Sequence, residues 1–593
     1  MPNNAQNNAL YYGDNLDVLR RKIRDETIDL CYIDPPFNSK RTYNQIYNNV
    51  GTEDRAQTQA FIDTWTWDDR AIAGYQEILS NDQGRFTSQT VDLLKGLQSV
   101  LKNGGLLAYL VSMTLRITEI QRVLKPTGSF YLHCDPTASH YLKLMTDTVF
   151  CPQGGDFQNE IIWRRTGSHN ATKSFGSIHD VILVYNKTMK YRFNIVRRPY
   201  MKRHVEERYT RQPDGQMKFT SGGNVLTGAG ATNGDSGKVW RGFDPTSKGR
   251  HWAVPKFYES LMPDEYRDLQ STEKLEALYQ TGLVEIDGTS AWPSMVRFLE
   301  EREGVPLQDL WAYQPYTEGT VWNTKDGIDA DVAWHGPTDP DRLGYQTQKP
   351  EGLLERIIAA STNENDVVLD AYCGCGTTVA VAEKLKRRWI GIDITYQSIA
   401  LMLSRLEGQY GKDVLSDIIL DGIPSDIASA YALAHKQDDR VRKEFEKWAV
   451  LTYTNNRAII NQKKGADGGI DGIAYFLTSH SGNAKIVFQV KSGKVGRGDI
   501  AKLRGDMQRE SAAMAVFITL EPPTAPMAAE AKAAGRYHHE IMDRSYDTIE
   551  IVTIQDIIDR KKELSIPLNF EVIKSAQRKA TDTQMPLMEE VAG

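Results

Sequence analysis

Short apolar runs that end abruptly in polar residues are the most regular feature of the first 410 residues. One run at 28–33 leads directly into the sequence Asp-Pro-Pro-Phe. Another at 367–369 ends at Asp370 and leads into a glycine-containing turn, a helix-like stretch and a further apolar run. Runs of this length are typical of strands buried in parallel sheets, and open α/β sheets bind ligands at the carboxyl ends of such strands. The pattern predicts an α/β fold with ligand-binding groups after these two strands.

The pattern changes after about residue 411. A polar and acidic stretch at 411–440 precedes a helix-like apolar period at 441–453, and this is followed by a strand, a turn and a second strand. We therefore expect a linker at 411–440, a second α/β domain at 441–560 and a tail at 561–593.

Composition narrows the class of protein. A chain of 593 residues exceeds what one hydrophobic core organises, which predicts roughly three or four domains of about 150 residues each. No apolar run approaches the ~20 residues of a membrane span, and the N-terminus lacks a basic segment followed by an apolar one. We therefore expect a cytoplasmic protein that does not enter a membrane. The net charge of −6 confines any nucleic-acid-binding surface to a local region.

The sequence at 34–37 places hydrogen-bond acceptors at the end of a strand. An amine on an aromatic base is a poor nucleophile because its lone pair is delocalised into the ring, and acceptors that bind its two hydrogens draw that lone pair out. The Asp34 carboxylate and the Pro35 carbonyl are such acceptors. Pro36 restricts the backbone and Phe37 can stack on the base, which has to leave its duplex. The simpler interpretation is a strand that ends in a Pro-Pro turn.

A nucleotide-type pocket is predicted after the second strand. One aspartate ends that strand, two glycines allow the backbone to approach a ligand closely, and a threonine can begin the following helix. A second aspartate, about twenty residues later, can bind ribose hydroxyls. A dinucleotide oxidoreductase is the competing interpretation, but the third glycine of its fingerprint is absent and Asp-Pro-Pro-Phe has no role in hydride transfer. The candidate residues are Asp370, Gly374, Gly376, Thr377 and Asp393.

A basic and aromatic stretch at 197–211 is a candidate DNA-binding segment. Cations suit phosphates and rings suit bases, and the cations here are interleaved with Tyr200 and Tyr209. Glu206 and Glu207 support the alternative, a charged helix exposed to solvent. The candidate cations are Arg197, Arg198, Lys202 and Arg203.

Residues 10–410 resemble the β class of amino-methyltransferases, in which the catalytic segment precedes the cofactor segment. The resemblance implies a Rossmann-like enzyme that methylates double-stranded DNA from S-adenosylmethionine. It implies catalytic and cofactor-binding halves at 1–189 and 336–410, with a target-recognition region at 190–335 between them. The matching motifs, in order, are Gly13-Asp14, Asp34-Pro35-Pro36-Phe37, LKPTGSFYLHCD at 124–135, NEIIWRR at 159–165, HDVILVYNK at 179–187, YQTQKPEGLLERII at 345–358 and the glycine turn after Asp370.

The resemblance also assigns residues to the cofactor and to DNA. It implies that Thr347, Lys349 and Pro350 hold the methionine end of the cofactor. It implies further that Asp14 faces the adenine of the cofactor and that Asp393 binds its ribose. Within the recognition region, the segment at 240–252 joins the basic stretch as an expected groove-facing element. The cations of this segment are Arg241, Lys248 and Arg250.

The target base is predicted from Asp34. Family members with an Asp-Pro-Pro start usually methylate N6 of adenine, whereas a Ser-Pro-Pro start usually indicates N4 of cytosine. N4-cytosine methylation stays an alternative, since both bases offer an exocyclic amine of similar geometry. A further alternative is a DNA-cleaving or DNA-binding protein that uses S-adenosylmethionine only as an effector.

The second domain carries residues suited to metal-dependent hydrolysis. Asp471 and Gln489 fall on neighbouring predicted strands and can hold Mg²⁺ through a carboxylate and an amide oxygen. Lys491 is two residues from Gln489, on the same face, where its cation can stabilise the attacked phosphate. The alternative is a strand hairpin whose charges face water.

With Glu446 in the preceding helix, residues 441–560 resemble the Mrr-like branch of PD-(D/E)xK restriction endonucleases. In this fold an acidic residue usually lies two positions before the motif lysine. That position is occupied here by Gln489, two residues before Lys491, as is common in the Mrr-like branch. A methyltransferase fused to a nuclease implies a restriction–modification protein. The sequence leaves open a homodimer or separate partner subunits.

Overall fold

The computed structural model describes most of the chain between residues 8 and 566. The chain divides into two compact units, of which residues 195–308 and 313–330 form the smaller. Two predicted site residues, Phe37 and Thr347, lie outside the described ranges. These ranges are 8–36, 65, 67–167, 175–219, 226–286, 292–299, 304–336, 339, 348–424, 426–435, 439–454, 458–460, 469–478, 483–540, 542–559 and 561–566.

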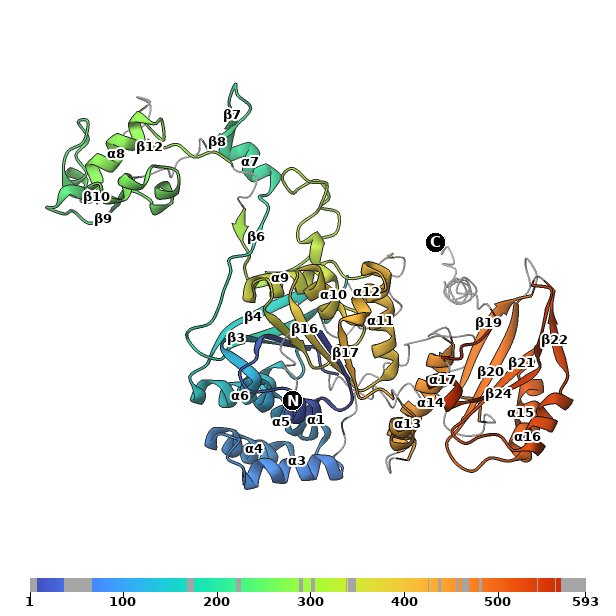
Figure 1. The fold of residues 1–593 in the computed structure, drawn as a ribbon. Helices are drawn as coiled ribbons and strands as arrows, with labels where there is room; N and C mark the ends of the chain where they lie inside the picture. Colours follow the sequence, from blue (N-terminus) through green and yellow to red (C-terminus); the bar gives the residue numbers. More distant parts are fainter. Residues whose placement is uncertain are drawn as a thin grey trace, which may run out of the picture. The chain divides into compact units, whose positions relative to one another are not determined.

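A mixed nine-stranded sheet organises the larger unit (Figure 1). Its order is β14-β4-β5-β3-β2-β15-β16-β1-β17, with β5 antiparallel to both neighbours and all other neighbours parallel. The run at 28–33 is β2, buried along its whole length, and the run before Asp370 is β15, its direct neighbour. The bounds are β1 Asn8–Tyr12, β2 Ile28–Ile33, β3 Leu124–Cys134, β4 Asp156–Arg164, β5 His179–Asn186, β14 Leu310–Trp311, β15 Val367–Asp370, β16 Arg388–Asp393 and β17 Ile418–Asp421.

Helices cover both faces of this sheet. One face packs against α1, α3, α4, α5 and α6 through a core that includes Cys31 and Ile33. The other packs against α9, α10 and α11 through a core that includes Leu30 and Tyr32. Alternate residues of β2 therefore bury opposite faces, which explains why the whole strand is buried. The bounds are α1 Asn15–Lys22, α3 Asp69–Ser80, α4 Ser88–Leu101, α5 Gly105–Val123, α6 Ser139–Phe150, α9 Glu351–Ser361, α10 Thr377–Lys384, α11 Tyr396–Tyr410, α12 Asp413–Ser416, α13 Ile427–Ala434 and α14 Asp439–Tyr453.

The stretch at 411–440 does not form the linker that its polar composition predicted. It contains β17, which extends the large sheet beside β1, and α13, which packs against α14. One apolar core also joins Tyr396 and Ala400 of α11 to Phe445 and Trp448 of α14. The C-terminal domain predicted to begin at 441 therefore shares part of its core with α11. The apolar run in β17 is too short for a pattern search, because an aspartate stands on either side of it.

A second sheet, of order β18-β19-β20-β21-β24, occupies the C-terminal part. Strands β18 to β20 are antiparallel, and β20, β21 and β24 are parallel. The predicted helix at 441–453 lies within α14, and the predicted pair of strands is β19 and β20. The bounds are β18 Ile459–Ile460, β19 Gly472–Leu477, β20 Asn483–Lys491, β21 Met514–Thr519, β22 Arg536–His539, β23 Arg544–Asp547, β24 Ile549–Thr553, α15 Arg497–Arg509, α16 Ala525–Ala533 and α17 Ile554–Ile558.

The smaller unit is built from short strands and helices around an aromatic core that includes Trp240, Trp252, Tyr258 and Tyr266. In neither unit does a described helix combine the length and the apolar character that crossing a membrane requires. The bounds are β6 Arg197–Arg198, α7 Lys202–Arg208, β7 Tyr209–Arg211, β8 Met217–Phe219, β9 Thr227–Ala229, β10 Arg250–Trp252, α8 Ser271–Gln280, β11 Val284–Glu285, β12 Ser294–Met295 and β13 Val305–Pro306.

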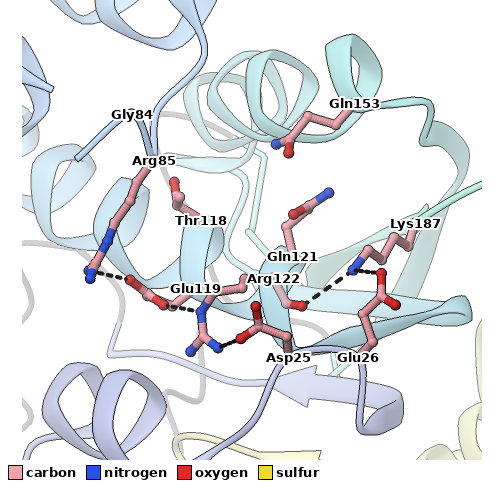
Figure 2. Close-up of a pocket in the computed structure, with 10 residues that line it drawn as sticks. All are labelled: Asp25, Glu26, Gly84, Arg85, Thr118, Glu119, Gln121, Arg122, Gln153 and Lys187. Carbon is pink, nitrogen blue, oxygen red and sulfur yellow. Dashed lines mark hydrogen bonds and ion pairs between the residues drawn. The ribbon is translucent and has the colours of Figure 1, made fainter. Parts of the chain in front are cut away.

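The buried carboxylate of Glu119 lies beside a cavity of about 630 Å³, and Figure 2 shows it between Arg85 and Arg122. Glu119 of α5 accepts hydrogen bonds from Arg20 (3.1 Å), Arg85 (2.9 Å) and Arg122 (2.7 Å). The cavity also borders the residues just before β2, so it lies at the amino edge of the sheet, away from Asp34. Because cations and carboxylates pair with one another around the cavity, we interpret the cluster as a structural anchor for α1 and α5.

Replacing Glu119 by alanine is expected to lower the free energy of unfolding by about 3 kcal/mol, because three guanidinium groups lose a carboxylate that is only 2% exposed. Urea unfolding followed by circular dichroism measures the loss. The matched control is Asp17→Ala, which breaks an exposed pair with Arg21 (3.6 Å) and should change stability by less than about 0.5 kcal/mol. Equal losses in the two variants would contradict the anchoring role.

Candidate active sites

The end of β2 presents the predicted acceptors. Asp34 and Pro35 directly follow the strand, and the Lys349 ammonium donates a hydrogen bond to the Asp34 carboxylate. Both side chains are largely shielded from solvent, at 11% exposure for Lys349 and 18% for Asp34. The structure thus brings Lys349, expected at the methionine end of a cofactor, to the predicted catalytic carboxylate. Pro350 then caps α9, and the Lys349 carbonyl accepts a weak bond from Thr377 (3.4 Å).

A second carboxylate lies at the same edge, because β15 runs parallel to β2. Asp370 accepts hydrogen bonds from the Thr378 hydroxyl (2.5 Å) and from the backbone N–H of Tyr372 (3.0 Å). Burial raises the pKa of the Asp370 carboxyl to about 7, and the charges of Asp34 and Asp393 add to the rise. The protein therefore holds this acid where a nearby positive charge would stabilise its ionised form.

The glycine turn after β15 holds a third carboxylate. Gly374 has a φ of +48°, and its N–H donates to Asp393 at the end of β16 (2.9 Å). The N–H and the hydroxyl of Thr395 also donate to this carboxylate, at 2.8 and 2.9 Å, while burial raises the pKa of Asp393 to about 6. Gly376 has a φ of +76°, and its predicted close approach to a ligand stays a prediction. A Cβ there would collide with Met402 of α11, so Gly376 approaches a neighbouring helix closely.

A fourth carboxylate, Asp14, follows β1 and caps α1 by accepting from the N–H of Leu16 (2.8 Å). Arg116 of α5 pairs with Asp14 (3.2 Å) and donates to Asn15 (2.5 Å). Asn15 in turn donates to the carbonyl of Ala371 beside the glycine turn (2.8 Å). Arg116 was not predicted, because it lies in the middle of an apolar helix outside any motif.

The four carboxylates therefore follow four neighbouring parallel strands in the order β2, β15, β16 and β1. The carboxyl ends of parallel strands share one edge of a sheet, where open α/β sheets bind ligands. Two of the four acids have raised pKa values because burial disfavours their charge. Such a cluster suits a ligand that carries positive charge and hydroxyl groups.

The C-terminal sheet also assembles the predicted metal-binding groups. Asp471 precedes β19 and accepts a hydrogen bond from the N–H of Val490 on β20 (2.7 Å). The neighbouring Gln489 donates through Nε2 to the carbonyl of Gly469 (2.8 Å), and its buried Oε1 has no hydrogen-bond partner among the described residues. Buried oxygen atoms are seldom left without a hydrogen-bond partner. The Oε1 atom of Gln489 is therefore suited to bind a cation.

Charges from two elements meet at Asp471. Burial raises the pKa of Asp471 to about 7, and the charge of Glu446 on α14 adds to the rise, while Lys491 and Lys443 oppose it. Lys443 was not predicted, although it precedes Glu446 by one helical turn. Within the described ranges no three His, Cys, Asp or Glu residues cluster as metal ligands, and the predicted metal-binding role of Asp471 and Gln489 stays a prediction.

Two of the predicted DNA-binding cations are engaged within the smaller unit. Arg241 forms two hydrogen bonds to Glu276 (2.9 and 2.6 Å) and lies 3.9 Å above the ring of Tyr279. Arg250 donates to the hydroxyl and the carbonyl of Thr227 (2.7 and 2.8 Å). These contacts stabilise the smaller unit. DNA contact by either arginine stays a prediction.

The other predicted DNA-binding cations differ in the partners that they contact. Lys202 and Arg203 pair with glutamates one turn further along α7 (3.9 and 2.6 Å), which is the pattern of the charged-helix alternative. Arg197 donates to a backbone carbonyl (2.7 Å), and Arg198 lies 3.8 Å from an aspartate. Lys248 is exposed on a short turn of 3₁₀ helix.

Comparisons with known proteins match both parts of the chain. Residues 28–403 match a family described as DNA methylase, acting at N6 or N4, and residues 441–558 match the Mrr catalytic family, described as restriction endonuclease. The chain is 28% identical over 292 residues to the type II methyltransferase M.EcaI of Enterobacter cloacae, covering 48% of this chain and 54% of that protein. It is 26% identical over 396 residues to the type III restriction-modification enzyme StyLTI Mod subunit of Salmonella typhimurium, covering 63% and 50%.

Shorter and weaker likenesses complete the comparison. The DNA adenine methyltransferase YhdJ of Escherichia coli is 51% identical over 63 residues, or 11% of this chain and 21% of that protein. The solved structure of PvuII DNA methyltransferase, described as cytosine-N4-specific, has 12% identity and a TM-score of 0.33, covering 70% of this chain and 95% of that one. The chain spans about half the length of the first two relatives.

Proposed function

The chain belongs to the N6/N4 DNA methylase family and carries an Mrr-like restriction endonuclease domain, and from this premise we propose that it methylates N6 of adenine in double-stranded DNA. The observation that carries the proposal is the placement of Asp34 and Pro35 beside Asp370, at the carboxyl edge of parallel strands. S-adenosylmethionine is the proposed methyl donor.

The proposed chemistry uses Asp34 and Pro35 as acceptors for the two hydrogens of the target amine. Holding both hydrogens directs the nitrogen lone pair toward the methyl donor. Lys349 donates a hydrogen bond to the Asp34 carboxylate and fixes its direction, and the carboxylate enters the proposed reaction as an acceptor. The target base has to leave the duplex to reach these groups.

The cluster of carboxylates fits S-adenosylmethionine, whose sulfonium and ammonium groups are cations and whose ribose carries hydroxyls. The cofactor supplies the methyl group when it is bound. Asp393 accepts three hydrogen bonds from the protein and retains acceptor capacity for ribose hydroxyls, while Asp14 is proposed to face the adenine. Thr377 and Pro350, beside the Asp34–Lys349 pair, are proposed to border the methionine end.

Adenine is proposed as the target because Asp34 opens the Pro-Pro motif and because YhdJ, similar over a short segment, is an adenine methyltransferase. N4-cytosine methylation is the alternative. DNA treated with the protein and labelled S-adenosylmethionine, digested to nucleosides and separated by chromatography, identifies the methylated base. Label in N4-methylcytosine would overturn the adenine proposal, and an absence of label would overturn methyl transfer.

Replacing Asp393 by alanine is expected to weaken S-adenosylmethionine binding about ten- to hundredfold, because a hydrogen bond to a charged acceptor contributes about 1.5–3 kcal/mol. Isothermal titration calorimetry measures the change. The control is Asp421→Ala, at the end of β17 on the same edge, where the carboxylate is paired with Lys22 (2.7 Å) outside the cluster. If both variants bind the cofactor normally, the proposed pocket is misplaced.

A second proposed activity is Mg²⁺-dependent DNA cleavage by the C-terminal domain, which would make the chain a restriction–modification enzyme. The buried, unpartnered Oε1 of Gln489 beside Asp471 favours it, since these oxygens and Glu446 fit a hard cation. Both activities act on DNA, and we propose a cytoplasmic location. That the protein acts as a homodimer or with partner subunits stays a prediction.

A further inference from the structure

A chain of buried polar side chains crosses three strands beneath the proposed methyl-transfer site. The Tyr32 hydroxyl lies 2.9 Å from Nδ1 of His133, and Nε2 of His133 lies 3.2 Å from Asp180. Arg165 lies 3.2 Å from the other oxygen of Asp180. Tyr32 and Asp180 are each 2% exposed and His133 is fully buried.

The chain lies at the edge of the sheet that carries the site. Tyr32 is on β2, His133 on β3 and Asp180 on β5, which are successive neighbours in the sheet. Strands β2 and β3 end at this edge, whereas the antiparallel β5 begins there. Tyr32 is two residues before Asp34, and side chains two apart point to the same face of a strand. The charge of Lys349, the partner of Asp34, also acts on Asp180.

The hydrogen bonds of the chain start from an ionised acceptor, Asp180. Burial alone would raise the pKa of Asp180, but the bond from His133 and the charge of Arg165 hold it below its usual value. An ionised Asp180 accepts, so Nε2 of His133 donates to it and the orientation of the ring is set. The other ring nitrogen, Nδ1, is hydrogen-bonded to the Tyr32 hydroxyl. Each group fixes the orientation of the next, from β5 to the residue two positions before Asp34.

Such a chain is costly in an apolar core. A buried carboxylate and imidazole lose hydration, and apolar residues of similar volume would pack there without that loss. Proteins retain buried polar networks where orientation matters, since hydrogen-bonded members hold one another rigidly. The links from Asp180 to His133 and from His133 to Tyr32 are at hydrogen-bond distance, whereas Arg165 and Asp180 form only an ion pair. Here the held element is the end of β2, which carries both acceptors for the target amine.

We propose that Tyr32, His133 and Asp180 are positioning residues that fix the end of β2, so that the Asp34 carboxylate and the Pro35 carbonyl keep the separation that the target amine requires. The proposal rests on the proposed methyl transfer. None of the three residues is expected to touch the base or the cofactor. Their loss should therefore slow the chemical step without weakening either ligand, because a displacement of about 1 Å costs on the order of 10²-fold in rate.

The experiment compares kcat, the KM for DNA and the Kd for S-adenosylmethionine in the full chain and in Tyr32→Phe, which keeps the ring and removes the hydroxyl. We expect kcat to fall at least about tenfold, with both binding constants within about twofold of the parent. Asp180→Asn, which keeps the side-chain shape, should reproduce this split. The matched control is Ser129→Ala, which breaks a buried bond to Asn186 (2.9 Å) on the same strands, four residues before His133.

Each outcome decides a separate point. If the parent transfers no methyl group, the proposed function fails. If the parent is active and Tyr32→Phe keeps its kcat, the positioning role fails. It also fails if Tyr32→Phe weakens both binding constants in proportion to its loss of kcat, or if Ser129→Ala lowers kcat equally, because these results indicate a general packing defect.

Discussion

Replacing Asp34 by alanine is expected to lower methyl transfer by at least about 10²–10³-fold, while S-adenosylmethionine binds within a few-fold of normal. The carboxylate is proposed to meet the target amine, and the other three acids of the cluster, which are proposed to face the cofactor, remain in place. Incorporation of labelled methyl groups into DNA measures the first effect, and calorimetric titration of the cofactor measures the second. Loss of cofactor binding equal to the loss of transfer would refute this role of Asp34.

Replacing Lys349 by methionine tests the other member of the ion pair between Asp34 and Lys349. If Lys349 acts mainly on Asp34, the variant should lose turnover and keep its affinity for the cofactor, because the ammonium donates to that carboxylate in the structure. If Lys349 instead holds the methionine end, as the family resemblance implies, affinity should fall first. Lys349→Arg keeps the positive charge and a hydrogen-bond donor, and it should retain more turnover than Lys349→Met in the first case.

Local sequence predicted the parts of the methylase site that a strand and its following turn determine. The buried run of β2, the Asp-Pro-Pro motif and the glycine turn after Asp370 each depend on a few neighbouring residues. The pattern of apolar and polar residues did not predict contacts between distant segments. Lys349 meets Asp34 across 315 residues of chain, and Arg116 meets Asp14 across 102. Periodicity indicates which face of an element is buried, and it does not indicate which charges from different elements meet.

The strand and helix within the stretch at 411–440 were not predicted, for a related reason. The composition of the stretch is polar, yet β17 needs only a short apolar run, because it lies at the edge of a sheet whose other strands supply most of the core. The N-terminus of α11 likewise depends on tertiary structure. Glu444 of α14 accepts from the N–H of Tyr396 (3.1 Å), a partner 48 residues away. Polar composition predicts exposure, but it does not exclude a strand or helix that is completed by distant partners.

For the C-terminal domain, Asp471→Ala and Lys491→Ala are each expected to remove Mg²⁺-dependent DNA cleavage. Phosphodiester hydrolysis needs a metal-bound water and a cation near the attacked phosphate. Asp471 is proposed to supply charge to the metal, and Lys491 to stabilise the phosphate. Methylation should stay nearly intact, because Asp471 and Lys491 belong to the five-stranded sheet, and α14 bonds to α11 through other side chains, Glu444 and Thr452.

The metal site should also show a defined pH dependence. Burial and the charge of Glu446 raise the pKa of Asp471 to about 7, so a proton competes with Mg²⁺ below that pH. The Mg²⁺ concentration needed for half-maximal cleavage is therefore expected to rise as the pH falls from about 8 to about 6.

Gln489→Glu should tighten Mg²⁺ binding or be tolerated, since it adds a charge, whereas Gln489→Ala removes the proposed ligand oxygen and should lower activity.

Plasmid cleavage with Mg²⁺ tests these expectations, with and without S-adenosylmethionine, on DNA that carries or lacks the methyl mark. Lys485→Met is the matched control for Lys491→Ala, because Lys485 lies on the same strand and pairs with Glu510 (3.4 Å) rather than acting at Asp471. The control should cut at the parental rate, while the Asp471 and Lys491 variants should not cut. If the intact protein cuts none of these substrates, or if both variants cut as well as it does, the nuclease assignment fails and a DNA-binding or structural role replaces it.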